Sequence, residues 1–205
     1  MRELSLHLLD LLENSIRAGA NVISVTIEGD AQNDTLRLSV QDNGKGFAVP
    51  PEVAASPFYT TSGSKRTGLG LSLLSAAAQQ AGGGMTLGRS ELLGGAAVEA
   101  VMGLSHIDRA PLGDLAGTVA AIVCTHPEAD ICVELRFGGK RLAIRSAELA
   151  ASLPPDRRDG LAVARLIRQA LRSAPKLDEP ASAGALAGGP ASPDGPPPGK
   201  PSKRA

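Results

Sequence analysis

Three short motifs near the N-terminus narrow the folds open to this chain more than its composition does. They are Asp10-Leu11-Leu12-Glu13-Asn14, Asp42-Asn43-Gly44-Lys45-Gly46 and Gly68-Leu69-Gly70-Leu71. Each motif alone is weak, because a short run of aspartate and glycine is common in tight turns. Their fixed order, with two strand patterns between the first and the second, carries much more information.

Hydrophobic periodicity predicts a helix, two strands, a helix and two more strands over residues 1–104. The first helix has apolar residues at helical spacing from Leu4 to Ile16 and ends at a glycine C-cap. Strands are expected at residues 22–28, 35–41, 85–88 and 96–102, with the second helix at 71–81. Residues 48–67 are rich in Pro, Ser, Thr and Gly, which predicts a mobile loop or lid. This order predicts an antiparallel sheet with helices on one face, a two-layer α+β sandwich.

The composition changes after residue 104, and we expect a second unit there. Helices predicted at 112–123 and 158–173 flank strands at 131–137 and 140–145, which gives a small α-β-β-α appendage over residues 105–173. Residues 174–205 are Pro, Gly, Ala and Ser with scattered charge. They contain too little apolar mass to fold and are predicted to be a disordered tail.

Charge and composition exclude several classes of partner. Lys and Arg total 21, as do Asp and Glu, so no overall field favours nucleic acid or an anionic membrane. The chain has no Trp, one Tyr and three Phe, which leaves no aromatic platform for stacking bases. Cys124 and Cys132 lack companion metal ligands and are expected to be a buried pair of free thiols. Because there is no signal-peptide pattern and no apolar run of roughly 18 residues, we expect a cytoplasmic protein without a membrane span.

Asp42 and the glycines that follow it suit recognition of adenine. A carboxylate at the end of a buried strand can accept a hydrogen bond from the exocyclic amine of the base. Gly44 and Gly46 carry no Cβ where the loop has to pass the base and fold back. The alternative is a plain Asp-Asn-Gly turn, which this motif would favour if it stood alone.

Asn14 lies in the middle of the first helix, where a short amide is unfavourable. Asp10 and Arg17 share its face at i−4 and i+3, and we expect this polar stripe to face a cleft. The alternative is a solvated face on which Glu13 and Arg17 form an i,i+4 ion pair. His7, one turn before Asp10, would either orient that carboxylate or lie at the edge of the core, and the second interpretation is favoured.

The predicted lid and the helix after it suit phosphate. Gly68 and Gly70 open the helix expected at 71–81, whose N-terminal N–H groups and dipole favour an anion. Lys65 and Arg66 are placed to reach the β- or γ-phosphate of a nucleotide when the lid closes. The alternative is two exposed charges on a loop.

Together the three motifs resemble the N, G1 and G2 boxes of the GHKL ATP-binding superfamily over residues 3–104. That superfamily includes histidine-kinase catalytic domains, Hsp90 chaperones, type II topoisomerases and MutL mismatch-repair ATPases. The run Pro57-Phe58-Tyr59-Thr60-Thr61-Ser62, with Gly68-Leu69-Gly70-Leu71, resembles the PFFTTK…GTGLGL stretch of histidine kinases. The segment LENSIRAGAN at residues 12–21 also resembles the ENSLDAGA run of MutL proteins. The resemblance implies a Bergerat-type fold that binds ATP with Mg²⁺.

The resemblance also implies roles for individual residues. Asn14 would coordinate Mg²⁺, and Arg17 matches a basic position that touches phosphate in histidine kinases. Asp10 stands where the MutL and anti-sigma-kinase branches have a glutamate that acts as general base, and its side chain is one methylene shorter. The implied nucleotide site comprises Asn14, Arg17, Asp42, Gly44, Gly46, Lys65, Gly68 and Gly70, with Asp10 as the catalytic residue.

Residues 105–112, SHIDRAPL, resemble the SHELRTPL phospho-acceptor box of histidine kinases. Ile107 replaces the acidic residue that follows the histidine in that box. The segment also follows the predicted ATP-binding domain instead of preceding it. We therefore expect His106 to be a histidine in a linker.

The favoured function is that of a histidine-kinase-like ATP-binding protein in bacterial signalling. It would transfer a phosphoryl group to a regulatory or substrate protein in trans, or hydrolyse ATP slowly. One alternative is an ATP-gated binding switch with weak catalysis, which the shortened Asp10 favours. Another is a dimerising ATPase like those of DNA repair, which would form a homodimer, although the balanced charge makes DNA binding less attractive.

Overall fold

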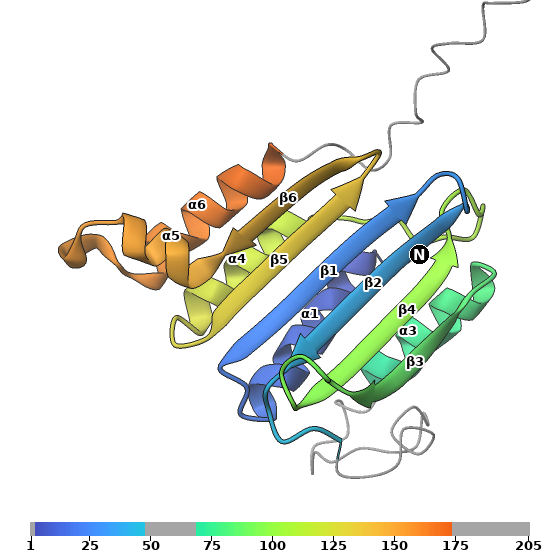
Figure 1. The fold of residues 1–205 in the computed structure, drawn as a ribbon, viewed down its shortest axis with the longest axis horizontal. Helices are drawn as coiled ribbons and strands as arrows, with labels where there is room; N and C mark the ends of the chain where they lie inside the picture. Colours follow the sequence, from blue (N-terminus) through green and yellow to red (C-terminus); the bar gives the residue numbers. More distant parts are fainter. Residues whose placement is uncertain (1–2, 48–68, 174–205) are drawn as a thin grey trace, which may run out of the picture.

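The computed structural model of the chain describes residues 3–47 and 69–173 (Figure 1). The lid predicted at residues 48–67, with Lys65 and Arg66, lies outside the described residues. So do Gly68 and the tail predicted at residues 174–205. No helix within the two described ranges is both long enough and apolar enough to cross a membrane.

The elements up to residue 103 follow the periodicity of the sequence. They are α1 (Leu4–Arg17), β1 (Val22–Asp30), β2 (Thr35–Asp42), α3 (Leu69–Gln80), β3 (Gly84–Arg89) and β4 (Ala96–Gly103). α1 ends at the predicted place: Ala18 is its C-cap and Gly19 has a φ of 79°, a left-handed conformation that glycine adopts without strain. The helices and strands predicted for this part of the chain are confirmed.

Residues 115–172 add two strands and three α-helices to the fold. They are α4 (Leu115–Thr125), β5 (Asp130–Phe137), β6 (Lys140–Arg145), α5 (Ser146–Ser152) and α6 (Gly160–Arg172), with a 3₁₀ turn at Pro155–Arg157. The predicted α-β-β-α order is confirmed, and α5 is an addition to it. The periodicity does not reveal α5 because this helix has only seven residues and follows β6 with no turn residue between them.

The six described strands belong to one sheet, in the order β3-β4-β2-β1-β5-β6. β1, β2, β4 and β3 pair antiparallel, which confirms the antiparallel sheet predicted for the first 104 residues. β5 pairs in parallel with β1, and β6 pairs antiparallel with β5. The strands of the C-terminal segment therefore extend the same sheet. The division of the chain at residue 104 stays a prediction, because a domain boundary depends on whether each part folds alone.

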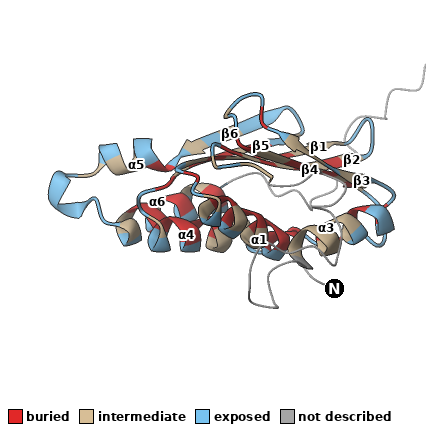
Figure 2. Cartoon of the chain, turned by 90° about the horizontal axis from the view of Figure 1, so that it is seen from below, coloured by how far each residue is buried: buried red, intermediate tan, exposed pale blue. Residues whose placement is uncertain are grey.

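Helices α1, α3, α4 and α6 cover one face of the sheet, and no described helix covers the other face (Figure 2). Residues facing the helices alternate along each strand. In β1, for example, Ile23, Val25 and Ile27 are at most 2 % exposed. They share a core with Leu8 and Leu12 of α1, which are fully buried. The two-layer α+β sandwich predicted from the sequence is the observed architecture.

The chain between β4 and α4 runs back to the start of α1. The N–H groups of Leu4 and Ser5 donate to the carbonyl oxygens of Pro111 and Leu112, at 2.8 and 2.9 Å. These N–H groups belong to the first turn of α1, where the helix itself offers them no carbonyl partner. α4 then packs against α1. The C-terminal segment thereby helps to fix the helix on which the first sequence motif lies.

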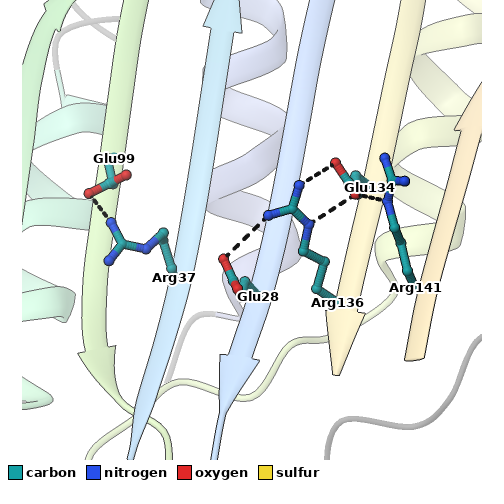
Figure 3. A network of polar contacts seen from close by, with 6 residues as sticks. All are labelled: Glu28, Arg37, Glu99, Glu134, Arg136 and Arg141. Carbon is teal, nitrogen blue, oxygen red and sulfur yellow. Dashed lines mark hydrogen bonds and ion pairs between the residues drawn. The ribbon is translucent and has the colours of Figure 1, made fainter. Parts of the chain in front are cut away.

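Charged side chains on the face of the sheet without helices pair with one another across the strands (Figure 3). Glu134 of β5 is the most connected of them. Arg136 donates two hydrogen bonds to its carboxylate, at 2.9 and 3.0 Å, and Arg141 of β6 donates a third. Exposed pairs of this kind stabilise a protein only slightly. The residues of the two paired groups are Glu28, Arg37, Glu99, Glu134, Arg136 and Arg141.

The pairing of Glu134 predicts a change in how stability depends on pH. Hydrogen bonds from Arg136 and then Arg141 hold the pKa of the Glu134 carboxyl below its ordinary value of 4.5. A carboxyl with a lowered folded-state pKa adds stability above its unfolded pKa, and that stability is lost as the pH falls through the folded pKa. Glu134→Gln should therefore make the urea unfolding midpoint fall less between pH 7 and pH 3 than it does in the wild type.

The expected effect is modest, because the side chain of Glu134 remains 19 % exposed and its arginines more so. A suitable control is Glu91→Gln, which changes an exposed carboxyl in the turn between β3 and β4. The control should keep the wild-type fall in the midpoint. Equal pH profiles for Glu134→Gln and the wild type would contradict the assignment.

Candidate functional site

Asp42, the last residue of β2, has a buried carboxylate with only 4 % of the residue exposed. Its Oδ1 accepts hydrogen bonds from the N–H groups of Gly44 and Ala96, at 2.9 and 3.1 Å. Its Oδ2 accepts one from the hydroxyl of Ser15, at 2.7 Å. A carboxylate offers about four acceptor directions. The donors in the described residues therefore fill both directions of Oδ1 and one of Oδ2, and no described donor fills the second direction of Oδ2.

Ser15 joins α1 to the end of β2. It occupies the next position of the apolar stripe that runs through Leu4, Leu8 and Leu12, and it is 4 % exposed. Burying a hydroxyl is unfavourable unless it has a hydrogen-bond partner, and the Asp42 carboxylate supplies that partner. Sequence reasoning missed Ser15, although a hydroxyl inside an otherwise apolar stripe is a signal for a buried partner.

Two glycines allow the backbone to close around the Asp42 carboxylate. A Cβ added to Gly95 would lie 2.4 Å from Asp42 Oδ1 and 2.6 Å from the backbone nitrogen of Gly44. A Cβ on Gly44 would lie 2.9 Å from the carbonyl oxygen of Ala18 at the end of α1. Gly46, further along the loop, has a φ of 72°, the left-handed conformation that favours glycine. Sequence reasoning named Gly44 and Gly46 but missed Gly95, which looks like an ordinary turn residue before β4.

Asn43 fixes the loop that follows Asp42 to the start of β1. Its Oδ1 accepts from the N–H groups of Asn21 and Val22, both at 3.0 Å. Its Nδ2 donates to Oδ1 of Asn21 at 2.6 Å. The amide therefore holds the loop in place, a role that sequence reasoning did not assign to it.

Asp10 lies against the first turn of α3. A Cβ added to Gly70 would come within 3.0 Å of Asp10 Cβ and 3.2 Å of Asp10 Oδ2. Glycine at position 70 thus lets α1 and α3 approach each other closely at this point. The carboxylate is half-buried beside the end of a helix where N–H groups lack intrahelical partners. Asp10 and Gly70, which the sequence places in different motifs, are brought together.

Asn14 and Arg17 contact each other on α1. Arg17 Nη2 donates to Oδ1 of Asn14 at 3.0 Å, and Nε donates to the carbonyl oxygen of Glu13 at 3.1 Å. Arg17 also forms an ion pair with Glu13, 3.5 Å between Nη2 and Oε2. The i,i+4 ion pair considered as an alternative is therefore present. The amide of Asn14 is half-buried, and its role in metal binding stays a prediction.

The two histidines that the sequence singled out differ in their surroundings. His7, one turn before Asp10 on α1, is buried, with 3 % of the residue exposed, and its part in orienting Asp10 stays a prediction. His106 is exposed after the far end of β4, where its Nδ1 accepts from the N–H of Asp108 at 3.2 Å. Because Ala96 at the start of β4 contacts Asp42, the length of β4 separates His106 from that carboxylate by about 23 Å. His106 is therefore out of direct reach of the Asp42 carboxylate in the same chain.

Within the described ranges, no three His, Cys, Asp or Glu side chains gather in a way that could hold a metal ion. Both cysteines are free thiols, as expected, but the expected burial is wrong: Cys124 is exposed and Cys132 is half-buried. Oxygen donors such as the Asn14 amide and the Asp10 carboxylate are the ones that a hard cation would find on α1. Lys65 and Gly68, the remaining predicted members of the site, lie outside the described residues.

A mixed sheet with helices on one face, and a buried carboxylate held between the second strand and the first helix, is consistent with a Bergerat-type ATP-binding fold. The family model described as histidine kinase-, DNA gyrase B- and HSP90-like ATPase matches residues 2–106, just over half of the chain. The chain belongs to this family, whose members are ATP-binding ATPases. No curated protein gives a significant match to the sequence.

The close approach at Gly95 predicts the effect of a single methyl group. Gly95→Ala would force the new Cβ against the Asp42 carboxylate and the Gly44 backbone, so we expect a loss of about 1–3 kcal/mol in the free energy of unfolding and weaker ATP binding. The measurements are urea unfolding and calorimetric titration with ATP. Gly88→Ala is the matched control, because a Cβ there meets nothing within 4 Å; a Gly95→Ala protein as stable as this control would contradict the packing.

Proposed function

We propose that the chain binds ATP with the adenine amine at Asp42 and transfers its γ-phosphoryl group to a partner protein, or hydrolyses it slowly. The observation that carries this proposal is the buried Asp42 carboxylate with one acceptor direction of Oδ2 left by the described donors. A buried charge of this kind is costly unless it is well bonded. An exocyclic amine would complete the set of donors.

The polar residues of α1 and the start of α3 would hold the phosphate end of the nucleotide. Asp10 lies next to Gly70, in the first turn of α3, and free N–H groups at a helix start favour an anion. Gly68 and Lys65 precede this turn in the sequence and would contact phosphate oxygens. Arg17, now bonded to Asn14, would turn toward the phosphates when they are bound.

Asn14 would hold Mg²⁺ through its amide oxygen. The fit rests on donor chemistry, because the half-buried amide of Asn14 offers an oxygen and magnesium prefers oxygen ligands while keeping several waters. The amide oxygen has a second lone pair besides the one that accepts from Arg17. A bound cation would neutralise charge on the phosphates.

Asp10 would act as the general base, taking the proton of the attacking hydroxyl or water. General base catalysis depends on geometry first, and a side chain one methylene shorter than glutamate requires a closer nucleophile. Most of the rate enhancement would come from positioning and charge stabilisation, as in other phosphoryl transfers. We place this activity in cytoplasmic signalling, on a regulatory or substrate protein in trans.

One observation favours a second function, an ATP-gated switch. The segment between β4 and α4 is hydrogen-bonded at Pro111 and Leu112 to the start of α1, the helix that carries Asp10 and Asn14. A shift of α1 on nucleotide binding would therefore reach the C-terminal segment without any turnover of ATP. In this case a partner protein would read the position of the C-terminal segment.

Asp42→Asn should lower ATP affinity by roughly 10- to 100-fold. The backbone N–H groups of Gly44 and Ala96 would hold the amide oxygen of the new side chain at the Oδ1 position. Its NH₂ group would then face the adenine amine, donor against donor. Calorimetric titration measures the change, with Asp108→Asn, an exposed carboxylate beside His106, as control. Unchanged affinity in Asp42→Asn would remove Asp42 from the site.

Asp10→Asn should leave ATP binding nearly unchanged and slow loss of the γ-phosphate by about 100-fold or more, because it removes the base and keeps the shape. A single-turnover assay with γ-labelled ATP gives the rate, and Glu13→Gln on the same helix is the control. Label that moves to protein or water in the wild type supports an enzyme. Tight binding with no loss of label in the wild type over hours would support the switch instead.

A further inference from the structure

The Asp42 carboxylate has one side-chain donor among the described residues, the hydroxyl of Ser15. The two backbone donors, Gly44 and Ala96, both bond Oδ1. Ser15 bonds Oδ2. The two oxygens therefore differ: Oδ1 accepts from two backbone N–H groups, and Oδ2 accepts from one side chain and keeps an acceptor direction that no described donor fills.

The direction of Oδ2 depends on the last torsion of the Asp42 side chain. This torsion is broad in aspartate, without sharp rotamer wells, and it moves both oxygens together because the carboxylate is planar. The two backbone donors restrain it at Oδ1. The bond from Ser15, at 2.7 Å, restrains it directly at Oδ2, and it comes from a different layer of the fold, because α1 packs on the face of the sheet that β2 helps to form.

The Ser15 hydroxyl also affects which groups can bind beside Oδ2 of Asp42. A serine hydroxyl has one hydrogen and two lone pairs. Once its hydrogen is committed to Asp42, Ser15 Oγ presents only acceptor capacity to any other group. Oδ2 and Ser15 Oγ are then neighbouring acceptors, which suit an amine with its hydrogens and repel a carbonyl oxygen.

We propose that Ser15 is a positioning residue that makes the site specific for a 6-amino purine nucleotide, by directing Oδ2 of Asp42 at the amine. The inference rests on the proposed ATP site and adds to it a residue that selects adenine over 6-oxo or unsubstituted purines. A purely structural role, in which Ser15 only satisfies a buried carboxylate, predicts a different result. In that case a change at Ser15 affects every purine nucleotide equally.

The test compares ATP with purine riboside triphosphate, which lacks the 6-amino group, by calorimetric titration in the presence of Mg²⁺. The wild type should bind ATP more tightly than the analogue. Ser15→Ala should weaken ATP binding about tenfold and leave the affinity for the analogue within about twofold, so that the preference for ATP shrinks by the same factor. Ser15→Thr, which keeps a hydroxyl, should restore most of the preference. Urea unfolding checks that each variant is folded.

The outcomes separate this inference from the proposed function. Suppose that the wild type prefers ATP. If Ser15→Ala then loses affinity for both nucleotides equally, or for neither, the role of Ser15 is overturned and the ATP site stays intact. A wild type that binds neither nucleotide would overturn both. If Ser15→Ala proves too unstable, Ser15→Cys, which replaces the hydroxyl with a weaker donor, should show a smaller loss of preference in the same direction.

Discussion

The burial of one carboxylate organises this end of the molecule. Asp42 is almost completely enclosed, so its charge requires donors, and the described ones come from three separate parts of the chain: α1, the loop after β2 and the start of β4. Satisfying the charge therefore brings these segments together, and Gly44 and Gly95 are the positions where the backbone approaches too closely for a side chain. The same arrangement that makes the burial tolerable leaves one acceptor direction of Asp42 Oδ2 that no described donor fills.

The helix beside this carboxylate is held from both ends. Ser15 ties its C-terminal half to Asp42, and the segment between β4 and α4 bonds its first N–H groups at Pro111 and Leu112. The parallel pairing of β5 with β1 places the C-terminal strands in the same sheet as β2, which carries Asp42. A segment that the family model does not match is thus in physical contact with the helix that carries the polar stripe.

Much of this could be read from the sequence, because the relevant signals are local. Periodicity gave the helices and strands, and the motif around Asp42 pointed to the end of a buried strand. Contacts between residues far apart in the sequence could not be predicted. Nothing near Ser15 or Gly95 in the sequence shows that both lie against Asp42. The alternation in β5 predicts a strand but not its neighbour, so its pairing with β1 required the structure. The partner of Arg17 could not be predicted from helical spacing either, because Glu13 and Asn14 both lie one turn before it and it contacts both.

Amide hydrogen exchange with and without Mg²⁺ and ATP tests most directly whether a purine nucleotide binds beside Asp42. Binding there should slow exchange in residues 42–46, in the turn at residues 94–96 and in the C-terminal half of α1. Exchange in β6, at the opposite edge of the sheet, should stay the same. If exchange in these three segments is not slowed at saturating ATP, a nucleotide site built around Asp42 is contradicted.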